Sequence, residues 1–172
     1  MQHIPGWFPT TNKETLEYLI KKYNIKTVLE IGSFVGLSTV WFAERVEKVV
    51  TVDPFDALTR INYLHGEMKE VAKDQWGNFL KNTAGFKNIE ALKMTSVEAA
   101  LMFQQPTFDM VYIDGSHDYE DVKIDILNWL PRAKKILCGD DYTKGWPGVR
   151  KAVDELTIPV NKNQRCWYII KQ

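Results

Sequence analysis

The sequence has few cysteines, no net charge and no long apolar run. Its two cysteines, Cys138 and Cys166, lack C-x-x-C spacing, so we expect packed, reduced thiols rather than a disulfide framework or a zinc site. The 22 basic and 22 acidic side chains cancel, which argues against a global field for nucleic acid or anionic membranes. No apolar stretch reaches the ~18 residues of a membrane span, and the N-terminus lacks a secretion-signal pattern. We therefore expect a cytoplasmic protein without nucleic-acid or membrane partners.

The dinucleotide fingerprint G-x-G-x-x-G is also absent. In its place the stretch Thr27–Ser38 carries an apolar run and then the pattern E-x-G-x-x-x-G, formed by Glu30, Gly32 and Gly36. Phe34 stands where a second glycine would let the backbone approach a pyrophosphate. A glycine turn at the end of a buried strand is nevertheless typical of a ligand site in an open α/β sheet, although helix–strand packing alone also uses such glycines.

Short apolar segments alternate with helical patterns along the whole chain. The 172 residues predict one domain, 1–172, with a doubly wound, mostly parallel α/β sheet of seven strands and an antiparallel C-terminal hairpin. The expected strands are Val28–Ile31, Lys48–Asp53, Asn88–Met94, Phe108–Asp114, Lys134–Gly139, Ile158–Val160 and Arg165–Ile170.

Helix signals are clear in some places and weak in others. Thr11 and Thr95 each begin a capping-box pattern, and Val71–Ala84 has a helical apolar face. The segment 54–70 is poorly periodic and is either an acceptor-side insertion or a plain connecting loop. The aromatic pair Trp7 and Phe8 lies in an N-terminal arm that covers an active-site mouth, joins a subunit contact or packs onto the core.

Asp53 ends the second strand about twenty positions after the glycine turn. At that spacing an acid is placed to hydrogen-bond the ribose hydroxyls of a nucleoside cofactor. The alternative is that Asp53 only begins a turn with Pro54.

Three further acids end two later strands. Asp114 closes the fourth strand, and Asp140 and Asp141 close the fifth. If these strands are neighbours, the carboxylates converge at one sheet edge and repel one another. A divalent cation with oxygen ligands, Mg²⁺ above all, removes this conflict. The alternative is that the aspartates only start turns and cap helices.

These motifs resemble a known enzyme family. The pattern E-x-G-x-x-x-G resembles the first motif of the class I S-adenosylmethionine (SAM)-dependent methyltransferases. The segments V-Y-I-D-G-S-H-D-Y-E-D-V, G-D-D-Y and W-P-G-V-R-K-A-V are similar to the small metal-dependent O-methyltransferases. That group includes catechol and macrolide-sugar O-methyltransferases and cephalosporin-hydroxylase-like proteins. The resemblance spans Thr27–Leu156 and implies a Rossmann-like methyltransferase fold.

The resemblance also implies roles for individual residues. The implied cofactor-binding positions are Glu30, Gly32, Ser33, Phe34, Gly36, Ser38, Asp53, Ser96 and Asp114. Within this set, Gly32 and Ser38 would hold the methionine end of SAM, and Ser96 would contact the adenine. The implied ligands of the divalent cation are Asp114, Asp140 and Asp141. His117 occupies the position of the catalytic base, where a histidine rather than a lysine favours the sugar-like branch. The implied reaction is O-methylation of a small hydroxylated acceptor.

Two departures from the family pattern leave alternatives open. The usual glycine pair before the fifth strand is replaced by Ala133-Lys134-Lys135. The chain is also short, so a second subunit in a homo-oligomer is one way to complete the acceptor pocket. The competing hypotheses are a nicotinamide-dependent (NAD) oxidoreductase, a non-catalytic binding module with the same fold, and methylation without a metal. The acceptor itself is not identified.

Overall fold

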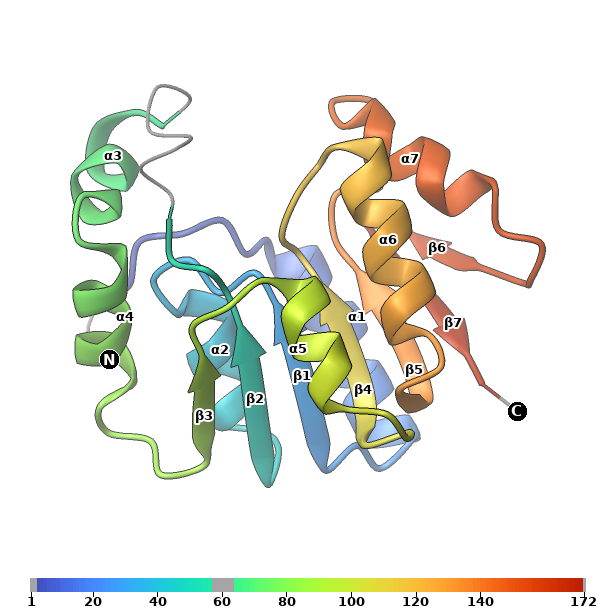
Figure 1. Cartoon of the computed structure of the whole chain (residues 1–172), viewed down its shortest axis with the longest axis horizontal. Helices are drawn as coiled ribbons and strands as arrows, with labels where there is room; N and C mark the ends of the chain where they lie inside the picture. Colours follow the sequence, from blue (N-terminus) through green and yellow to red (C-terminus); the bar gives the residue numbers. More distant parts are fainter. Residues whose placement is uncertain (1–2, 57–63, 172) are drawn as a thin grey trace.

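A single seven-stranded sheet forms the centre of the computed structural model, which describes residues 3–56 and 64–171. The strands are β1 (Thr27–Ile31), β2 (Lys48–Val52), β3 (Ile89–Leu92), β4 (Phe108–Ile113), β5 (Ala133–Gly139), β6 (Asn161–Asn163) and β7 (Cys166–Ile170). Their order is β3-β2-β1-β4-β5-β7-β6, with β3 to β5 parallel and β7 and β6 antiparallel to their neighbours. The predicted doubly wound sheet with an antiparallel C-terminal hairpin is therefore confirmed (Figure 1).

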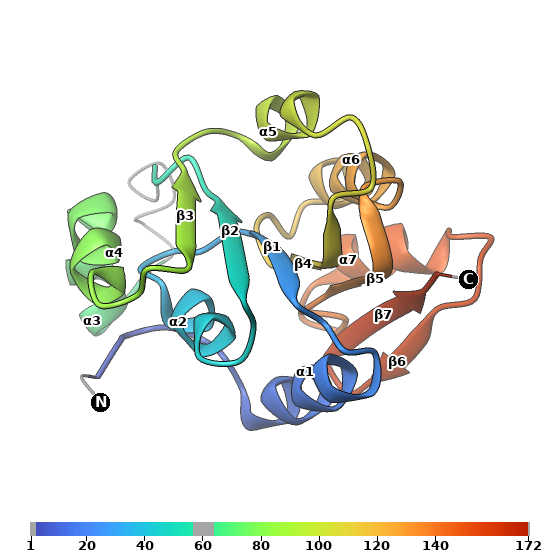
Figure 2. The same ribbon diagram turned by 90° about the horizontal axis from the view of Figure 1, so that it is seen from below.

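Helices cover both faces of the sheet. They are α1 (Thr10–Lys22), α2 (Leu37–Ala43), α3 (Gly66–Ala72), α4 (Gln75–Thr83), α5 (Ser96–Met102), α6 (Tyr119–Trp129) and α7 (Pro147–Asp154). Seen along the sheet, α5 and α6 lie on one side and α1 and α2 on the other, while α3 and α4 lie at the β3 end (Figure 2). Helix α7 packs in the same core cluster as α6. None of the helices in the described ranges is long and apolar enough to cross a membrane.

The central strands are apolar on both faces because each face is covered by helices. Leu29 and Val111 point into the core under α5, α6 and α7, whereas Val28 and Met110 point into the core under α1 and α2. All four side chains are completely buried. This double burial explains why the strands appear in the sequence as continuous apolar runs rather than alternating ones.

Some expected boundaries are wrong. The strand expected at Ile158–Val160 is absent, and the edge strand is instead the exposed, polar segment Asn161–Asn163. Such a strand carries no apolar signal because neither face is buried. The expected capping box at Thr11 is also wrong, because α1 starts directly after Pro9 without a side-chain cap. The capping box at Thr95 is confirmed, with both of its hydrogen bonds present.

The weakly periodic region after β2 is more helical than expected. Helix α3 begins at Gly66, inside the segment 54–70, and the expected helix Val71–Ala84 is divided between α3 and α4. Residues 57–63 of that segment, which include Arg60, lie outside the described part of the chain.

The two aromatic residues of the N-terminal arm have different environments. Phe8 is buried and packs edge-to-face against Trp41 of α2, so this part of the arm belongs to the core. Trp7 is 61% exposed, and its ring centroid lies 6.1 Å from that of Phe34 in the glycine turn. The arm is therefore anchored by one ring and places the other beside the predicted ligand turn.

Candidate active site

The order of the strands brings the predicted site residues together at one edge of the sheet. β1 pairs with β2 on one side and with β4 on the other, so the chain leaves β1 and β4 at a topological switch point. Ligands of open α/β sheets bind at this position, beyond the carboxyl ends of the strands. Gly32 directly follows β1, Asp114 follows β4, and Asp140 follows β5. The predicted convergence of the two acidic strand ends with the glycine turn is thus present.

The turn after β1 needs glycine for two separate reasons. Gly32 has a φ of +87°, in the left-handed region that other residues rarely adopt. A Cβ atom built on Gly32 would also lie 2.3 Å from the carbonyl oxygen of Asp114, so the two strand ends approach too closely for any side chain. Phe34 has a φ of +49°, an uncommon conformation for a bulky residue, and Gly36 precedes α2 at +95°. The turn is therefore tightly constrained.

Glu30 is the centre of a buried group of hydroxyls beneath this turn. The Glu30 side chain is completely buried and accepts hydrogen bonds from Ser38 and Thr39 at 2.5 Å and from Thr51 at 2.9 Å. Thr51 in turn contacts the hydroxyl of Ser33. Burial raises the pKa of Glu30 to about 7, although the three hydroxyl donors act in the opposite direction. Both Glu30 and Ser38 thus direct their polar atoms toward each other inside the protein.

This buried carboxyl should make stability depend on pH. Its pKa is about 7 in the folded protein against an ordinary value of 4.5, so between these values the folded state holds a proton that the unfolded state has lost. The free energy of unfolding should therefore fall as pH rises from 4.5 to 7, by about 3 kcal/mol at most, and then level off. Glu30→Gln should remove this contribution. Urea unfolding at pH 5, 6, 7 and 8 measures it.

Comparing the wild-type protein with Glu30→Gln separates the contribution of Glu30 to the pH dependence of stability from that of other buried acids. Asp125 also has a raised pKa, about 6, because it is buried, and it titrates equally in both proteins. The stability of Glu30→Gln relative to the wild-type protein should thus increase with pH. A constant difference across the range would show that Glu30 does not titrate there.

Asp53 is bound to the chain itself. Its carboxylate accepts hydrogen bonds from the backbone amides of Ser33 at 2.9 Å, Phe34 at 3.0 Å and Phe55 at 2.6 Å. A fourth hydrogen bond, 3.3 Å long, comes from the side chain of Gln75. Burial raises the pKa of Asp53 against the effect of these donors. The acid therefore holds the glycine turn to β2, and its contact with a ribose stays a prediction.

The acid after β4, Asp114, lies close to other negatively charged side chains. Asp114 is partly buried, and the hydroxyl of Tyr112 is 3.4 Å from its carboxylate. Burial, followed by the charges of Asp140 and Asp141, raises the pKa of Asp114 well above its ordinary value. The repulsion expected among the three acids is thus present at this position.

His117 is held by Asp141 and by an aromatic ring. Its Nε2 atom lies 2.6 Å from Oδ2 of Asp141. The indole of Trp146 stacks on the imidazole, with ring centroids 3.9 Å apart and an interplanar angle of 14°. The backbone at His117 also packs against α7 so closely that a Cβ on Gly148 would lie 2.4 Å from the His117 carbonyl oxygen. These contacts fix both the position and the plane of the ring.

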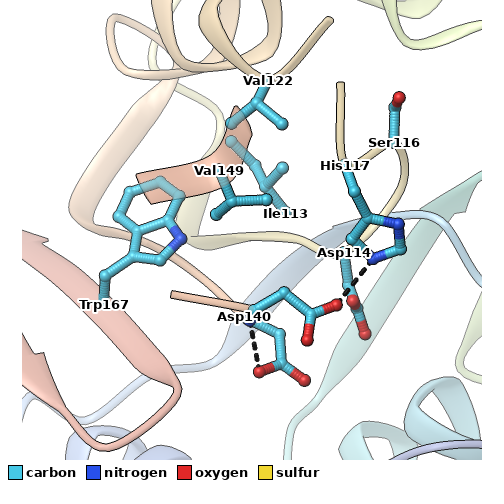
Figure 3. Close-up of a pocket in the computed structure, with 9 residues that line it drawn as sticks. Ile113, Asp114, Ser116, His117, Val122, Asp140, Val149 and Trp167 are labelled. Atoms are coloured by element: carbon cyan, nitrogen blue, oxygen red, sulfur yellow. Dashed lines mark hydrogen bonds and ion pairs between the residues drawn. The ribbon is translucent and has the colours of Figure 1, made fainter. Parts of the chain in front are cut away.

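Three of these side chains can share one metal ion. Asp114, His117 and Asp141 each offer a ligand atom, and these atoms all lie within 4.8 Å of one another. In Figure 3 the imidazole and the Asp114 carboxylate lie side by side in the same cavity. Asp140 lines this cavity too, but its Oδ1 accepts a 2.5 Å hydrogen bond from the backbone amide of Asp141. The group of three does not include Asp140, and the role of Asp140 as a metal ligand stays a prediction.

Arg165 belongs to none of the sequence motifs, yet it lies next to the acid pair Asp140 and Asp141. Its Nε is 3.3 Å from Oδ1 of Asp140, and its Nη2 contacts Oδ1 of Asp141. The residue belongs to the turn between β6 and β7, far from both acids in sequence. No local motif could have indicated it, because only the antiparallel pairing of β7 with β5 brings the turn to this edge.

Ser96 is used in packing between helices. Its hydroxyl contacts Asp125 and accepts a 2.7 Å hydrogen bond from the indole N–H of Trp129, both in α6. Ser96 therefore joins α5 to α6, and its contact with an adenine stays a prediction.

Comparison with known proteins identifies the family. A family model described as a methyltransferase domain matches residues 29–142, more than half of the chain. The chain belongs to the methyltransferase family. This match decides against the alternative of a nicotinamide-dependent oxidoreductase. No curated protein matches the sequence.

Solved structures of O-methyltransferases share the fold of this methyltransferase. The O-methyltransferase NovP matches with a TM-score of 0.72 and 14% identity over 94% of this chain and 79% of that chain. The O-methyltransferase from Bacillus cereus, in complex with S-adenosylhomocysteine (SAH), has a TM-score of 0.63 and 16% identity over 96% and 83%. TomG from Streptomyces achromogenes, in complex with SAM, has a TM-score of 0.63 and 16% identity over 96% and 82%. The shared fold is the Rossmann-like methyltransferase fold, with its mostly parallel sheet between helices.

Proposed function

We propose that this methyltransferase transfers the methyl group of SAM to a hydroxyl oxygen of a small acceptor, assisted by a divalent cation such as Mg²⁺. The observation that carries the proposal is the His117–Asp141 pair beside Asp114, at the sheet edge where the glycine turn lies. An imidazole among carboxylates is suited to removing a proton from a hydroxyl group, which is a poor nucleophile until it is deprotonated.

In this proposal His117 is the general base. Its Nε2 faces Asp141, and none of the described residues forms a hydrogen bond with Nδ1. With Nε2 donating to Asp141, the Nδ1 atom is free to accept the acceptor's proton. The negative charge of Asp141 then stabilises the imidazolium that results, and Trp146 keeps the ring in its plane.

The glycine turn and its supports form the proposed cofactor site. The backbone from Gly32 to Gly36 would hold the methionine end of SAM, and Glu30 and Ser38 fix the shape of the turn from below. The carboxylate of Asp53 already has four partners, so a ribose hydroxyl would take the place of the longest of them, Gln75. When bound, SAM supplies a methyl group on a sulfonium, which an oxygen nucleophile attacks in line.

The donor set suits a hard divalent cation. We propose that Asp114 and Asp141 hold the ion through carboxylate oxygens. The Asp140 carboxylate supports Asp141 by accepting a hydrogen bond from the backbone amide of Asp141. When bound, such an ion lowers the pKa of a coordinated hydroxyl and orients the acceptor. A ring nitrogen of His117 also belongs to the group, so a role as a third ligand is the alternative to its role as a base.

The acceptor is proposed to be a small hydroxylated molecule. A sugar-like hydroxyl and a catechol-like phenol both fit the chemistry of the site. Histidine at position 117 favours the sugar-like class, through the resemblance noted above.

Calorimetric titration with SAH, with and without Mg²⁺, tests the proposal. We expect SAH to bind in both conditions, and radiolabelled SAM to methylate catechol or a hydroxylated sugar derivative only when Mg²⁺ is present. Excess chelator should reduce this turnover at least tenfold. Absence of SAH binding would refute the cofactor assignment. Turnover that persists in excess chelator would refute the role of the cation. Tight SAH binding without turnover on the hydroxylated acceptors tested would favour a binding module.

A further inference from the structure

Arg165 pairs with two acids at the proposed cation site, and one of them, Asp141, would hold the cation. Its guanidinium reaches both members of the acid pair, through Nε to Asp140 and through Nη2 to Asp141. The backbone holds the residue in this place, because the amide of Tyr142, next to Asp141, donates a 2.9 Å hydrogen bond to the Arg165 carbonyl. The contact is thus built into the pairing of the C-terminal hairpin with the acidic turn.

The cationic partners of these acids are few. Within the described residues, the ion pairs made by the three carboxylates involve only Arg165 and, when it is protonated, His117. Arg165 therefore places a permanent positive charge at a cluster of three acids. It offsets the repulsion that would otherwise favour a bound metal ion.

Arg165 and the metal ion would use the same carboxylate. Oδ1 of Asp141 contacts Arg165, and Oδ2 of the same carboxylate lies 2.6 Å from Nε2 of His117. Asp141 also belongs to the candidate ligand set. A guanidinium and a divalent cation on one carboxylate repel each other, and each weakens the electrostatic attraction of the carboxylate for the other. The Arg165 side chain is 37% exposed, so solvent is available to hydrate it if it moves away.

We propose that Arg165 is an internal counter-cation that competes with the divalent metal for Asp141 and thereby weakens metal binding. The inference rests on the cation site of the proposed function. Arg165 holds the acid pair together in the metal-free protein, and metal binding requires the guanidinium to give up Asp141. The opposite role, in which Arg165 orients Asp141 for the metal and strengthens its binding, predicts an effect of the opposite sign.

Arg165→Met tests the proposal by titration with Mn²⁺ and Mg²⁺ in the absence of cofactor. The variant should bind each metal at least tenfold more tightly than the wild-type protein at equal ionic strength, a change of about 1.4 kcal/mol. In the metal-free state it should also have a lower Tm, and added metal should raise that Tm by more than it does in the wild-type protein.

Lys162→Met is the matched control. Lys162 lies on the same hairpin and its side chain is equally exposed at 37%, but it pairs with Asp154 rather than with the acid cluster. Its replacement removes the same charge and should leave metal affinity within twofold of the wild-type value. An equal gain in both variants would indicate a general charge effect and would overturn the proposal.

The remaining outcomes also decide. Unchanged or weaker metal binding by Arg165→Met, or no metal binding by either protein, would overturn the proposal. If Arg165→Met does not fold, Arg165→Lys replaces it, and metal binding at least threefold tighter than wild type is expected because one ammonium cannot bridge both acids as a guanidinium does. SAH titration of the same samples tests the methyltransferase site separately, so failure of one assignment is distinguishable from failure of the other.

Discussion

Replacing His117 with glutamine is expected to lower kcat by about 100- to 10,000-fold, the usual contribution of a general base. The glutamine amide can still donate to Asp141, so the change removes the proton acceptor and keeps much of the local hydrogen bonding. The affinity for SAH should change little, because His117 faces the acids rather than the glycine turn. Single-turnover methyl transfer, combined with SAH titration, measures the two effects separately.

His65→Gln is the control for this substitution. His65 is exposed and precedes α3 at a position for which we infer no role in the reaction. Its kcat should stay within twofold of the wild-type value. If His117→Gln instead loses affinity for Mn²⁺ in parallel with activity, His117 is a metal ligand rather than the base. Full activity in His117→Gln would remove both roles.

Gly32→Ala is expected to have the largest effect on the fold. The substitution forces alanine into a left-handed backbone with φ of +87° and places its Cβ 2.3 Å from the carbonyl oxygen of Asp114. The obstructing atoms belong to the backbone after β4, so they cannot move without separating the two central strand ends. Backbone strain and this overlap together should lower the free energy of unfolding by about 4 kcal/mol or more.

Gly85→Ala provides the comparison, because a Cβ at Gly85 meets nothing within 4 Å. Its stability should remain within about 0.5 kcal/mol of the wild-type value. Urea unfolding measures both variants. If Gly32→Ala remains folded, its SAH affinity should be at least tenfold weaker, since the altered turn is the proposed methionine site. A Gly32→Ala protein as stable as the wild-type protein would show that the two strand ends do not meet as described.

The sequence alone predicted the architecture well where burial imposes a strong pattern. The central strands β1, β2, β4 and β5 are apolar on both faces, so they were predicted within one residue of their observed ends. The acids and glycines that follow them were placed at the correct edge, because parallel strands of a doubly wound sheet share their carboxyl ends. The edge strand Asn161–Asn163 escaped prediction because its residues are exposed and polar.

The partners of the site side chains could not be predicted in the same way. Glu30 and Ser38 were expected near the cofactor, and the structure shows them bonded to each other beneath the turn. Ser96 was expected at the adenine, and the structure shows its hydroxyl accepting a hydrogen bond from Trp129 of α6. The strand order and register determine where the backbone of such a residue lies. The direction of its polar side-chain atoms depends on the neighbouring side chains that pack around it.

The sequence by itself therefore determined the central strands, the resemblance to the methyltransferase family and the edge of the sheet where the acids gather. Only the tertiary structure decided that His117 pairs with Asp141 and that Arg165 pairs with both Asp140 and Asp141. The reason is physical: local patterns record which residues are buried and where strands end. The contact between His117 and Asp141 depends on the parallel pairing of β4 with β5, and the contacts of Arg165 depend on the antiparallel pairing of β7 with β5. No local pattern encodes either pairing.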